Sequence, residues 1–364
     1  MVKKVEIKNK TVFVGVSGGV DSAIAALILK QQGYKVVGVF IRTWSPDFIK
    51  CTWREERRDA MRVCAHLDIP FLECDAEKEY EKGVAKYMIE EYKQGRTPNP
   101  DVMCNREVKF GVFWNYAKQK GADFIATGHY VNKEKKDGTY FLKKNLDEGK
   151  DQVYFLWTLT QEDLFHSLFP LGDLKKSQVR KLAKKYKLPN ANKKDSQGVC
   201  FLGPLDMKNF LQHYIQIKEG DVLNENGENI GVHDGAVFFT IGERHGFAIK
   251  KEYQSSKPLY IISKDVSKNT ITVSEKSPVL SDKEKRSSMI RININNVNWI
   301  SQRPDENKKY QAQIRYHGEL IDCYIKNIKD GKASVTFKSE LKIDAGQSMV
   351  FYEKDICLGG GVAD

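Results

Sequence analysis

The stretch "GVSGGVDS" (Gly15–Ser22) connects the apolar segment "KTVFV" (10–14) to the apolar-faced segment "AIAALILKQQG" (23–33). The hydrophobic pattern predicts a strand over 11–16 and a helix over 21–32, which the glycine that follows would end. A joint of this kind presents unpaired helix N–H groups and the positive end of the helix dipole. The stretch is therefore expected to bind an anion at the end of a buried strand.

The composition of this loop indicates that the anion is a phosphate. Its members are Gly15, Val16, Ser17, Gly18, Gly19, Val20, Asp21 and Ser22. The glycines let backbone amides approach phosphate oxygens closely, and the serines add hydroxyl donors. The loop matches neither of the two commoner phosphate-binding glycine motifs. Asp21 would repel a phosphate unless a cation stood between them, which predicts Mg²⁺ near this residue. The alternative is a tight turn capped by Ser17 or Asp21.

Strand-like and helix-like segments alternate through the first half of the chain. The pattern predicts further strands at 35–41, 70–74 and 123–128, and helices at about 54–67, 77–93 and 106–119, with a loop at 94–104. Strands that alternate with helices of this length form parallel βαβ units. We therefore expect an α/β fold with a doubly wound parallel sheet, and ligands bind such sheets at the carboxyl ends of their strands.

The second half of the chain has the pattern of short β-strands. Asn-Gly and Asp-Gly pairs at 226–227 and 234–235 predict hairpin turns, and alternating segments continue to the C-terminus. Turn-forming and charged residues cluster at 274–288, which predicts a break there. We expect three domains: an α/β domain at 1–205, a central mostly-β domain at 206–280 and a C-terminal β-barrel-like domain at 281–364.

Composition limits the class of protein. Hydrophobic residues make up 41% and charged residues 29% of the 364 residues. No apolar run approaches the ~18 residues of a membrane span, and no apolar segment follows the N-terminal lysines. The seven cysteines form no C-x-x-C pair, which argues against a structural zinc site and favours free thiols. A cytoplasmic protein without a membrane partner is expected.

Positive charge is concentrated in one segment. Lysine and arginine total 59 against 48 acidic residues, and nine of them lie between Leu174 and Lys194, where no acid occurs. An excess of this kind fits a polyanionic partner such as a nucleic acid. The alternative is a solvated helix face.

Two cysteines lie in loops rather than in apolar patterns. "GRTPNPDVMCNREVKF" (95–110) places Cys104 at the threshold of a helix, whose N-terminus is expected to lower the pKa of its thiol. "KKDSQGVCFLG" (193–203) places Cys200 directly after the basic segment. Replacing a carbonyl oxygen with sulfur requires an activated oxygen and a sulfur nucleophile. A cysteine persulfide can supply that sulfur and a second cysteine can release it, so this chemistry would use both residues.

The residues S-G-G-V-D-S resemble the signature of the ATP pyrophosphatases, which adenylate an oxygen of their substrate and release pyrophosphate. A more specific resemblance covers nearly the whole chain. The strings "GVSGGVDS", "GRTPNPDVMCN", "ATGHYV", "KDQVYFLWTL", "KKDSQGVCFLG" and "CLGGGVAD" occur in the order expected of the bacterial tRNA-specific 2-thiouridylases. The resemblance implies 2-thiouridine formation at the wobble base of the tRNAs for lysine, glutamate and glutamine, with ATP and Mg²⁺ as cofactors.

The resemblance also implies roles for individual residues. Cys200 would carry the persulfide, Cys104 would be the nucleophile paired with it, and Asp101 would act as an acid or base. ATP would be surrounded by Gly15 to Ser22, Ile41 and Gly128. The flipped target base would be bordered by Asn99, Pro100 and Asp101, and tRNA would contact His129, Lys150, Asp151, Gln152, Arg315, Tyr316 and Gln347. The sulfur donor would be a cysteine desulfurase or a sulfur-relay protein.

Three other functions are compatible with parts of the sequence. Another ATP pyrophosphatase, such as a tRNA lysidine synthetase or an amidating ligase, would share the loop but use an amine and need neither cysteine. An iron–sulfur enzyme would use Cys104, Cys200 and Asp101 as cluster ligands instead of a persulfide. A tRNA-binding protein without turnover would bind in a salt-sensitive way and release no pyrophosphate.

Overall fold

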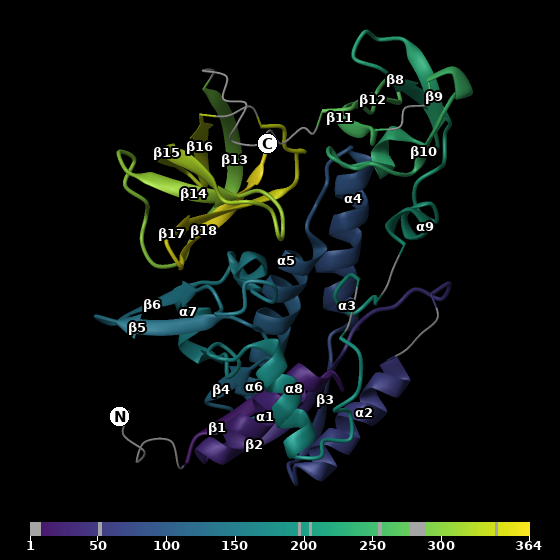
Figure 1. The fold of residues 1–364 in the computed structure, drawn as a ribbon. Coiled ribbons are helices and arrows are strands. Elements are labelled where there is room, and N and C mark those ends of the chain that lie inside the picture. Colours follow the sequence, from purple (N-terminus) through teal and green to yellow (C-terminus); the bar gives the residue numbers. More distant parts are fainter. Residues whose placement is uncertain are drawn as a thin grey trace.

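The computed structural model describes residues 9–49, 53–195, 198–203, 206–253, 257–276, 289–338 and 341–364. Three bodies are visible in Figure 1: an α/β domain at the bottom, a barrel at the upper left and a small β domain at the upper right. The helical segment that ends in α4 (Tyr87–Lys93) rises from the α/β domain toward the small β domain.

A five-stranded parallel sheet forms the centre of the α/β domain, as the alternating pattern predicts. Its strands in spatial order are β3 (Phe71–Asp75), β2 (Lys35–Arg42), β1 (Thr11–Gly15), β4 (Phe124–Ala126) and β7 (Ser167–Leu168). Every neighbouring pair is parallel. The chain leaves β1 toward β2 on one side and reaches β4 on the other, so the loop after β1 lies at a switch point of the sheet, where ligands bind.

Helices cover both faces of this sheet. Val12 and Val14 of β1 belong to a buried cluster that includes residues of α1 (Val20–Gln32), α2 (Trp53–His66) and α8 (Lys176–Lys185). Phe13, which points to the other face, belongs to a cluster with α5 (Pro100–Cys104) and α6 (Phe113–Gln119). The period-2 alternation of β1 therefore fills two cores, and the predicted doubly wound arrangement is confirmed.

Two helical segments that face each other have irregular centres. The first runs from α3 (Glu77–Tyr80) through a π-helical stretch at Glu81–Lys86 into α4, and the second runs from α5 through a π-helical stretch at Asn105–Val112 into α6. A Cβ at Gly83 would lie 3.0 Å from Glu107 Cγ, so a glycine permits this close packing. The second segment begins at Pro100, six residues before the predicted start, because Asn99 caps it and proline suits a first helical turn.

One hairpin of the first domain belongs to the C-terminal sheet. β5 (Asn132–Lys136) and β6 (Thr139–Lys143) pair with each other, and β6 pairs with β18 (Ile356–Ala363) through Leu142 and Cys357. The predicted strands of the first half did not include this hairpin, since its first strand, NKEKK, contains no apolar residue.

The small β domain contains one five-stranded sheet. Its spatial order is β10 (Phe247–Ile249), β9 (Asn229–His233), β8 (Gly220–Leu223), β12 (Thr270–Ser274) and β11 (Tyr260–Asp265). The predicted turn at 226–227 connects β8 to β9. A short helix, α9 (Met207–Leu211), precedes the sheet and packs beside α4. The predicted break at 274–288 lies largely outside the described residues, which end at 276 and resume at 289.

The C-terminal domain is a closed antiparallel barrel, in agreement with the barrel-like prediction. Its strands are β13 (Ile290–Trp299), β16 (Lys332–Phe337), β15 (Ile321–Lys329), β14 (Lys309–Gln313), β17 (Ser348–Glu353) and β18. Pairing between β13 and β18 closes the ring, which removes the free sheet edges. The alternating residues of these strands fill its interior.

A buried ion pair joins the three domains. Lys264 of the small β domain lies 3.2 Å from the Asp344 carboxylate of the barrel, and both side chains are less than a tenth exposed. Asp344 also accepts hydrogen bonds from the Thr97 hydroxyl of the α/β domain at 3.1 Å and from Ile241 N at 2.8 Å. This network fixes the barrel over the helical segment that begins after Thr97.

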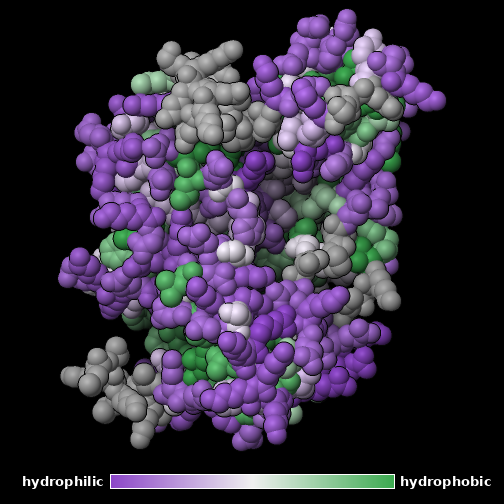
Figure 2. Space-filling view, in the orientation of Figure 1, coloured by the Kyte–Doolittle hydropathy of each residue, from purple (hydrophilic) through white to green (hydrophobic). Residues whose placement is uncertain are grey.

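The surface in Figure 2 is largely hydrophilic and is hollowed between the barrel and the small β domain. Among the described residues, no helix has the length and apolar character needed to cross a membrane. The face in view in Figure 2 is therefore mainly polar and carries no single large apolar patch among the residues described.

Candidate active site

The loop after β1 has a fixed shape. Ser22 Oγ accepts a hydrogen bond from Ser17 N at 3.3 Å and donates one to Gly19 O at 3.2 Å. Gly18 has a φ of +72°, and a Cβ there would lie 2.7 Å from Glu56 O. Both the left-handed conformation and the close contact require glycine at this position. The N-terminus of α1 is thereby presented at the carboxyl end of β1, as a phosphate cradle requires.

Buried hydrophobic residues pack against the loop that connects β1 to α1. Val16 and Val20 are buried, and Val16 N donates to Val39 O at 2.8 Å. Ile41 is also buried, and its Cδ1 atom would lie 3.7 Å from a Cβ at Gly15. The predicted nucleotide-contacting residues of β1 and β2 therefore lie beside each other.

Asp21 has a cation beside it, but that cation is a lysine. The Lys176 ammonium donates to both carboxylate oxygens of Asp21, at 2.7 and 2.8 Å, and Tyr130 Oη donates to one of them at 2.7 Å. Lys176 also lies 2.8 Å from Asp195. The part of the chain that the structure describes has no group of three His, Cys, Asp or Glu side chains placed to hold a metal ion. Lys176 thus places a positive charge beside Asp21, where the sequence predicted that Mg²⁺ would be the cation.

The basic segment divides into an inner and an outer set. Lys176, Arg180 and Lys193 form ion pairs with Asp21, Asp195 or Asp59. The remaining six side chains are exposed: Lys175, Lys181, Lys184, Lys185, Lys187 and Lys194. Only this outer set is available to a polyanion, while the inner set holds the nucleotide loop to the segment that leads to Cys200.

The two candidate cysteines meet, although 96 positions separate them. Cys104 Sγ lies 3.3 Å from Cys200 Sγ. Asp101 Oδ1 accepts a hydrogen bond from Cys200 N at 2.8 Å, and Tyr80 Oη donates to Cys200 O at 2.7 Å. Two anchors therefore hold the backbone of Cys200 over the helix that carries Cys104. The sulfur atoms are near enough to form a disulfide after a small movement.

The prediction that a helix N-terminus lowers the pKa of Cys104 is wrong. The helix starts at Pro100, so Cys104 lies beyond its first turn, and complete burial raises the pKa of the thiol well above its usual value. The lowered pKa belongs to Cys200: the hydrogen bond from Cys104 is the main cause, and the Lys109 ammonium contributes against the opposing effect of burial. Burial also raises the pKa of Asp101.

A short segment after β4 lies between the nucleotide loop and the thiols. A Cβ at Gly128 would lie 2.8 Å from Ser22 N, so the segment touches the start of α1. His129 is buried, and its Nδ1 atom lies 2.8 Å from the Thr127 hydroxyl. Burial, together with the nearby Lys109 ammonium, lowers the pKa of His129, which keeps the ring neutral at pH 7. The two halves of the site are therefore neighbours.

The predicted tRNA-contacting residues lie where the barrel meets the α/β domain. The Tyr316 ring lies 4.4 Å from the Phe155 ring, and Arg315 beside it is exposed. Tyr154 Oη donates to Ser348 O at 2.9 Å, which places the neighbouring Gln347 near the same region.

Four further residues predicted to contact tRNA or the target base have partners within the protein in this structure. Lys150 lies 2.9 Å from Asp195, and Gln152 Oε1 accepts from Tyr130 N at 3.0 Å. Asp151 accepts from Asn145 N at 2.9 Å, and burial raises its pKa to about 6. Asn99 accepts from Val102 N at 3.2 Å as the helix cap, with Pro100 next to it.

Sequence reasoning missed three residues of this region. Tyr80 hydrogen-bonds to Cys200 O, Lys109 lies against the ring of Phe201 beside the thiol pair, and Lys176 pairs with Asp21. Lys109 stands in the quoted string 95–110, but its distance of five residues from Cys104 does not place it on the same face of an ordinary α-helix. No motif near Tyr80 in the sequence indicated that this residue belongs to the site.

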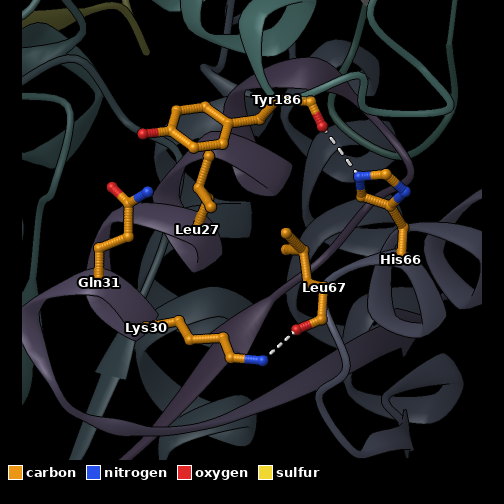
Figure 3. A pocket seen from close by; sticks show the side chains of 6 residues that line it. All are labelled: Leu27, Lys30, Gln31, His66, Leu67 and Tyr186. Atoms are coloured by element: carbon orange, nitrogen blue, oxygen red, sulfur yellow. Dashed lines mark hydrogen bonds between the residues drawn. The ribbon is translucent and has the colours of Figure 1, made fainter.

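A separate depression of about 420 Å³ lies at the other end of α1. Figure 3 shows its lining by Leu27, Lys30, Gln31, His66, Leu67 and Tyr186. Lys30 Nζ donates to Leu67 O at 2.5 Å and His66 Nε2 lies 2.9 Å from Tyr186 O, so the two basic side chains of its lining are already engaged. The loop and the thiols lie at the opposite end of the helix.

A parallel sheet with a glycine-rich phosphate cradle, next to a buried thiol pair and followed by two β domains, defines a multidomain nucleotide-dependent enzyme of sulfur chemistry. Comparison with protein families agrees with this class. The family models that match are the tRNA methyl transferase HUP domain at residues 10–204, the tRNA methyl transferase PRC-barrel domain at 208–275 and the aminomethyltransferase beta-barrel domain at 290–363.

Curated relatives are similar over almost their entire length. The tRNA-specific 2-thiouridylase MnmA of Bacillus velezensis is 42% identical over 367 residues, which cover 98% of this chain and 95% of the relative. The protein of the same name from Francisella tularensis subsp. holarctica is 41% identical over 364 residues, with 98% and 99% covered. The chain belongs to the tRNA-specific 2-thiouridylase family.

Solved structures are similar to about half of the chain, at low identity and low TM-score. The U34-tRNA thiolase NcsA from Methanococcus maripaludis, with its 4Fe–4S cluster, has a TM-score of 0.36 and 18% identity, covering 58% of this chain and 66% of that one. The NMN synthetase from Francisella tularensis has a TM-score of 0.34 and 19% identity, covering 56% and 72%.

Proposed function

We propose that this protein is an enzyme that converts the wobble uridine of the tRNAs for lysine, glutamate and glutamine to 2-thiouridine, with consumption of ATP. The observation that carries the proposal is the thiol pair, Cys104 and Cys200, whose sulfur atoms lie 3.3 Å apart beside a nucleotide loop. Amidating and lysylating relatives of the fold would not need it. Within this proposal, residues 1–205 adenylate and thiolate, and 206–280 and 281–364 are the two β domains.

ATP binds at the loop, with its pyrophosphate half against the amides of Gly18 and Gly19 and its adenine near Ile41 and Gly128. The N-terminus of α1 supports negative charge there. Asp21 is held by Lys176, and the residues that the structure describes offer Mg²⁺ no cage of their own. A magnesium ion would be held chiefly by the phosphates of ATP, where it would neutralise their charge.

The reaction requires both thiols. Attack of the C2 oxygen of uridine on the α-phosphate releases pyrophosphate and gives an adenylated oxygen, which is a good leaving group. The outer sulfur of a Cys200 persulfide then attacks C2 and AMP leaves. Cys104 finally attacks the inner sulfur of Cys200. The S–S bond to the outer sulfur breaks, the outer sulfur stays on C2 as the thiocarbonyl of 2-thiouridine, and a Cys104–Cys200 disulfide remains. Two thiols are oxidised as the transferred sulfur is reduced, so the disulfide must be reduced between turnovers.

Asp101 is the candidate acid or base of this reaction, because its carboxyl group lies against Cys200 N and its pKa is raised by burial. The sulfur reaches Cys200 from a cysteine desulfurase or a sulfur-relay protein. Reduction of the disulfide between turnovers requires a reducing compartment, so we place the reaction in the cytoplasm.

The tRNA lies across the junction of the α/β domain and the barrel. An anticodon base is extruded at low cost because the loop is partly single-stranded, and Asn99, Pro100 and Asp101 border it. His129, Lys150, Asp151 and Gln152 contact the RNA from one side. Arg315, Tyr316 and Gln347 contact it from the other, and the outer lysines of α8 follow its phosphates.

Mass spectrometry of digested nucleosides tests the proposal. Unmodified glutamate tRNA is incubated with Mg·ATP, a persulfide donor and either wild-type protein, Cys200→Ser or the control Cys323→Ala, whose thiol is buried in the barrel core. We expect 2-thiouridine with wild type and the control only. Product formation by Cys200→Ser, or pyrophosphate release without thiolated base from wild type, would contradict the proposal.

An iron–sulfur mechanism is the second candidate for the sulfur step. It predicts iron in anaerobically purified protein and broad visible absorbance. We favour the persulfide because the described residues contain no three-ligand group placed for a metal. Stoichiometric iron that is lost in Cys104→Ser would overturn this choice without affecting the identity of the product.

A further inference from the structure

The helix that carries Cys104 has an unusual period directly after this residue. In an α-helix, a residue five positions on is turned by about 140° away from the first. The stretch Asn105–Val112 is π-helical, and its wider turn brings positions five apart to nearly the same face. A Cβ at Gly111 would lie 2.9 Å from Arg106 O, so a glycine accommodates this wide turn. Lys109 is thereby placed on the face of Cys104.

The ammonium group of Lys109 lies at the thiol pair. It lies 5.7 Å from the centre of the ring of Phe201, the residue after Cys200. Against the opposing effect of burial, the nearby Cys200 and Cys104 thiols raise the pKa of Lys109. Among the described residues, Lys109 forms no ion pair within 4.0 Å, so its charge is directed to the thiols rather than to a carboxylate partner. Its side chain is partly buried, which strengthens its electrostatic effect relative to a surface lysine.

The charged and titratable groups that face Cys200 come from four elements. Asp101 and Cys104 lie on α5, Lys109 lies on the π-helical stretch and Tyr80 lies at the end of α3. His129 is near Lys109 and is neutral at pH 7. Lys109 is the one cation among them. Asp101 opposes a negative charge on Cys200, and the Cys104 thiol supports it by donating a hydrogen bond.

We propose that Lys109 is the positioning residue that holds Cys200 as a thiolate and so makes Cys200, rather than Cys104, the thiol that accepts sulfur from the donor. The proposal rests on the function proposed above. In the loading step, the Cys200 thiolate attacks the outer sulfur of a donor persulfide, R–S–SH. The S–S bond of the donor breaks, R–S⁻ leaves, and Cys200–S–SH forms. No electrons are gained or lost in this exchange, and Cys104 keeps its proton until the later release step.

The test measures alkylation of each cysteine by iodoacetamide between pH 6 and 10, with peptide mass spectrometry to separate Cys104 from Cys200. The proteins are wild type, Lys109→Gln, Lys109→Arg and the control Lys118→Gln, which changes an exposed lysine of the same helical segment. We expect Lys109→Gln to slow alkylation of Cys200 about tenfold at pH 7, which corresponds to a pKa higher by about one unit. Lys109→Arg should restore most of the rate, and Lys118→Gln should match wild type.

An unchanged Cys200 profile in Lys109→Gln would overturn the proposal, as would equal slowing by Lys118→Gln. Retained ATP binding in each variant shows that the α/β domain is folded. Alkylation uses neither tRNA nor a sulfur donor, so it separates two failures. If Lys109→Gln shifts the alkylation profile but wild type makes no 2-thiouridine, the role of Lys109 stands and the proposed function is rejected. If wild type makes 2-thiouridine but Lys109→Gln leaves the profile unchanged, the proposed function stands and the role of Lys109 is rejected.

Discussion

The nucleotide loop and the thiol site are neighbours, yet the chain builds them in opposite ways. The loop is eight consecutive residues whose shape depends on backbone conformation, above all at Gly18. The thiol site draws Tyr80, Asp101 and Cys200 from three separate segments and depends on how helices pack. A change in the loop should therefore affect nucleotide binding alone, and a change among the thiols should affect sulfur transfer alone.

The largest expected effect is that of Asp101→Asn. The amide can still accept the hydrogen bond from Cys200 N, but it cannot exchange a proton with substrate. We expect single-turnover thiolation to fall by about 10²–10⁴-fold, the usual contribution of a positioned acid or base. Because burial raises the pKa of Asp101, the carboxyl stays protonated to a higher pH than usual, and the rate should fall as pH rises through that pKa if Asp101 donates the proton.

Rates measured between pH 5 and 8 check this expectation, and calorimetric titration with ATP supplies the control. The variant should show a flatter pH profile and wild-type ATP affinity. Loss of ATP affinity in Asp101→Asn would show that the thiol site and the nucleotide loop are coupled, which would contradict the expectation that each can be changed alone.

Gly18→Ala should produce the next largest effect. Its Cβ would lie 2.7 Å from Glu56 O in a left-handed conformation, so the loop must shift. We expect ATP binding to weaken about 100-fold, or about 2.8 kcal/mol at 1.4 kcal/mol per tenfold. Gly33→Ala is the matched control: Gly33 also has a positive φ, at the other end of α1, but a Cβ there would meet nothing within 4 Å.

Both glycine variants should lose some stability, since both place alanine at a positive φ. Only Gly18→Ala should lose ATP affinity, and neither should alter the alkylation profile of Cys200. Equal ATP binding by the two variants would show that the cradle does not depend on Gly18.

The same contrast explains what the sequence could and could not predict. The parallel sheet, the barrel and the loop follow from periodicity and from a contiguous motif, because the signals lie within a few residues of each other. The neighbourhood of Cys104 and Cys200 could be inferred only from the resemblance, since no local pattern relates positions 96 residues apart. Lys109 was missed because its placement depends on the π-helical turn, which no rule for α-helices predicts.

The sequence also predicts only part of how the charged residues are used in the structure. The segment 174–194 is plainly basic, but the sequence does not distinguish Lys176, which is committed to Asp21, from Lys184, which is exposed. Of the acids that pair with the inner set, Asp21 and Asp59 come from distant segments, and Asp195 directly follows the basic segment. The pKa expected for Cys104 was wrong for a similar reason: the helix begins earlier than its charged residues indicate, because Asn99 and Pro100 start it.

A moderate effect is expected when the outer lysines are reversed in charge. Replacing Lys184, Lys185 and Lys187 by glutamate should weaken tRNA binding and reduce the slope of log affinity against log salt by about two to three, since each lost phosphate contact removes about 0.7–0.9. The ATP affinity should not change, because these side chains are exposed and pair with no residue of the loop.

The matched control replaces Lys326, Lys329 and Lys332 by glutamate, which makes the same change in net charge. These exposed residues lie at the β15–β16 turn, the opposite end of β15 from Tyr316. Filter binding between 50 and 300 mM salt measures both. A control with the same loss would indicate that overall charge, rather than a defined α8 surface, attracts the tRNA.

The smallest effect concerns Asp151, whose charge adds to the effect of burial in raising the pKa of Tyr316 of the barrel. Because burial raises its pKa to about 6, Asp151 is mostly neutral at pH 5.5 and charged at pH 7.5. A carboxylate repels phosphate, so wild-type tRNA binding should weaken a few-fold across this range. Asp151→Asn should remove part of that change and bind tRNA more tightly only at the higher pH.

The difference between the two proteins isolates Asp151, because every other titratable group is the same in both. Binding is measured at pH 5.5 and 7.5 at one ionic strength, and ATP affinity is followed in parallel. If Asp151→Asn binds tRNA more tightly than wild type by the same factor at both pH values, the effect comes from the shape of the side chain and not from its ionisation. A parallel change in ATP affinity would mean that the charge of Asp151 reaches the nucleotide loop through the Lys150–Asp195–Lys176 chain, and the loop would then depend on its neighbour after all.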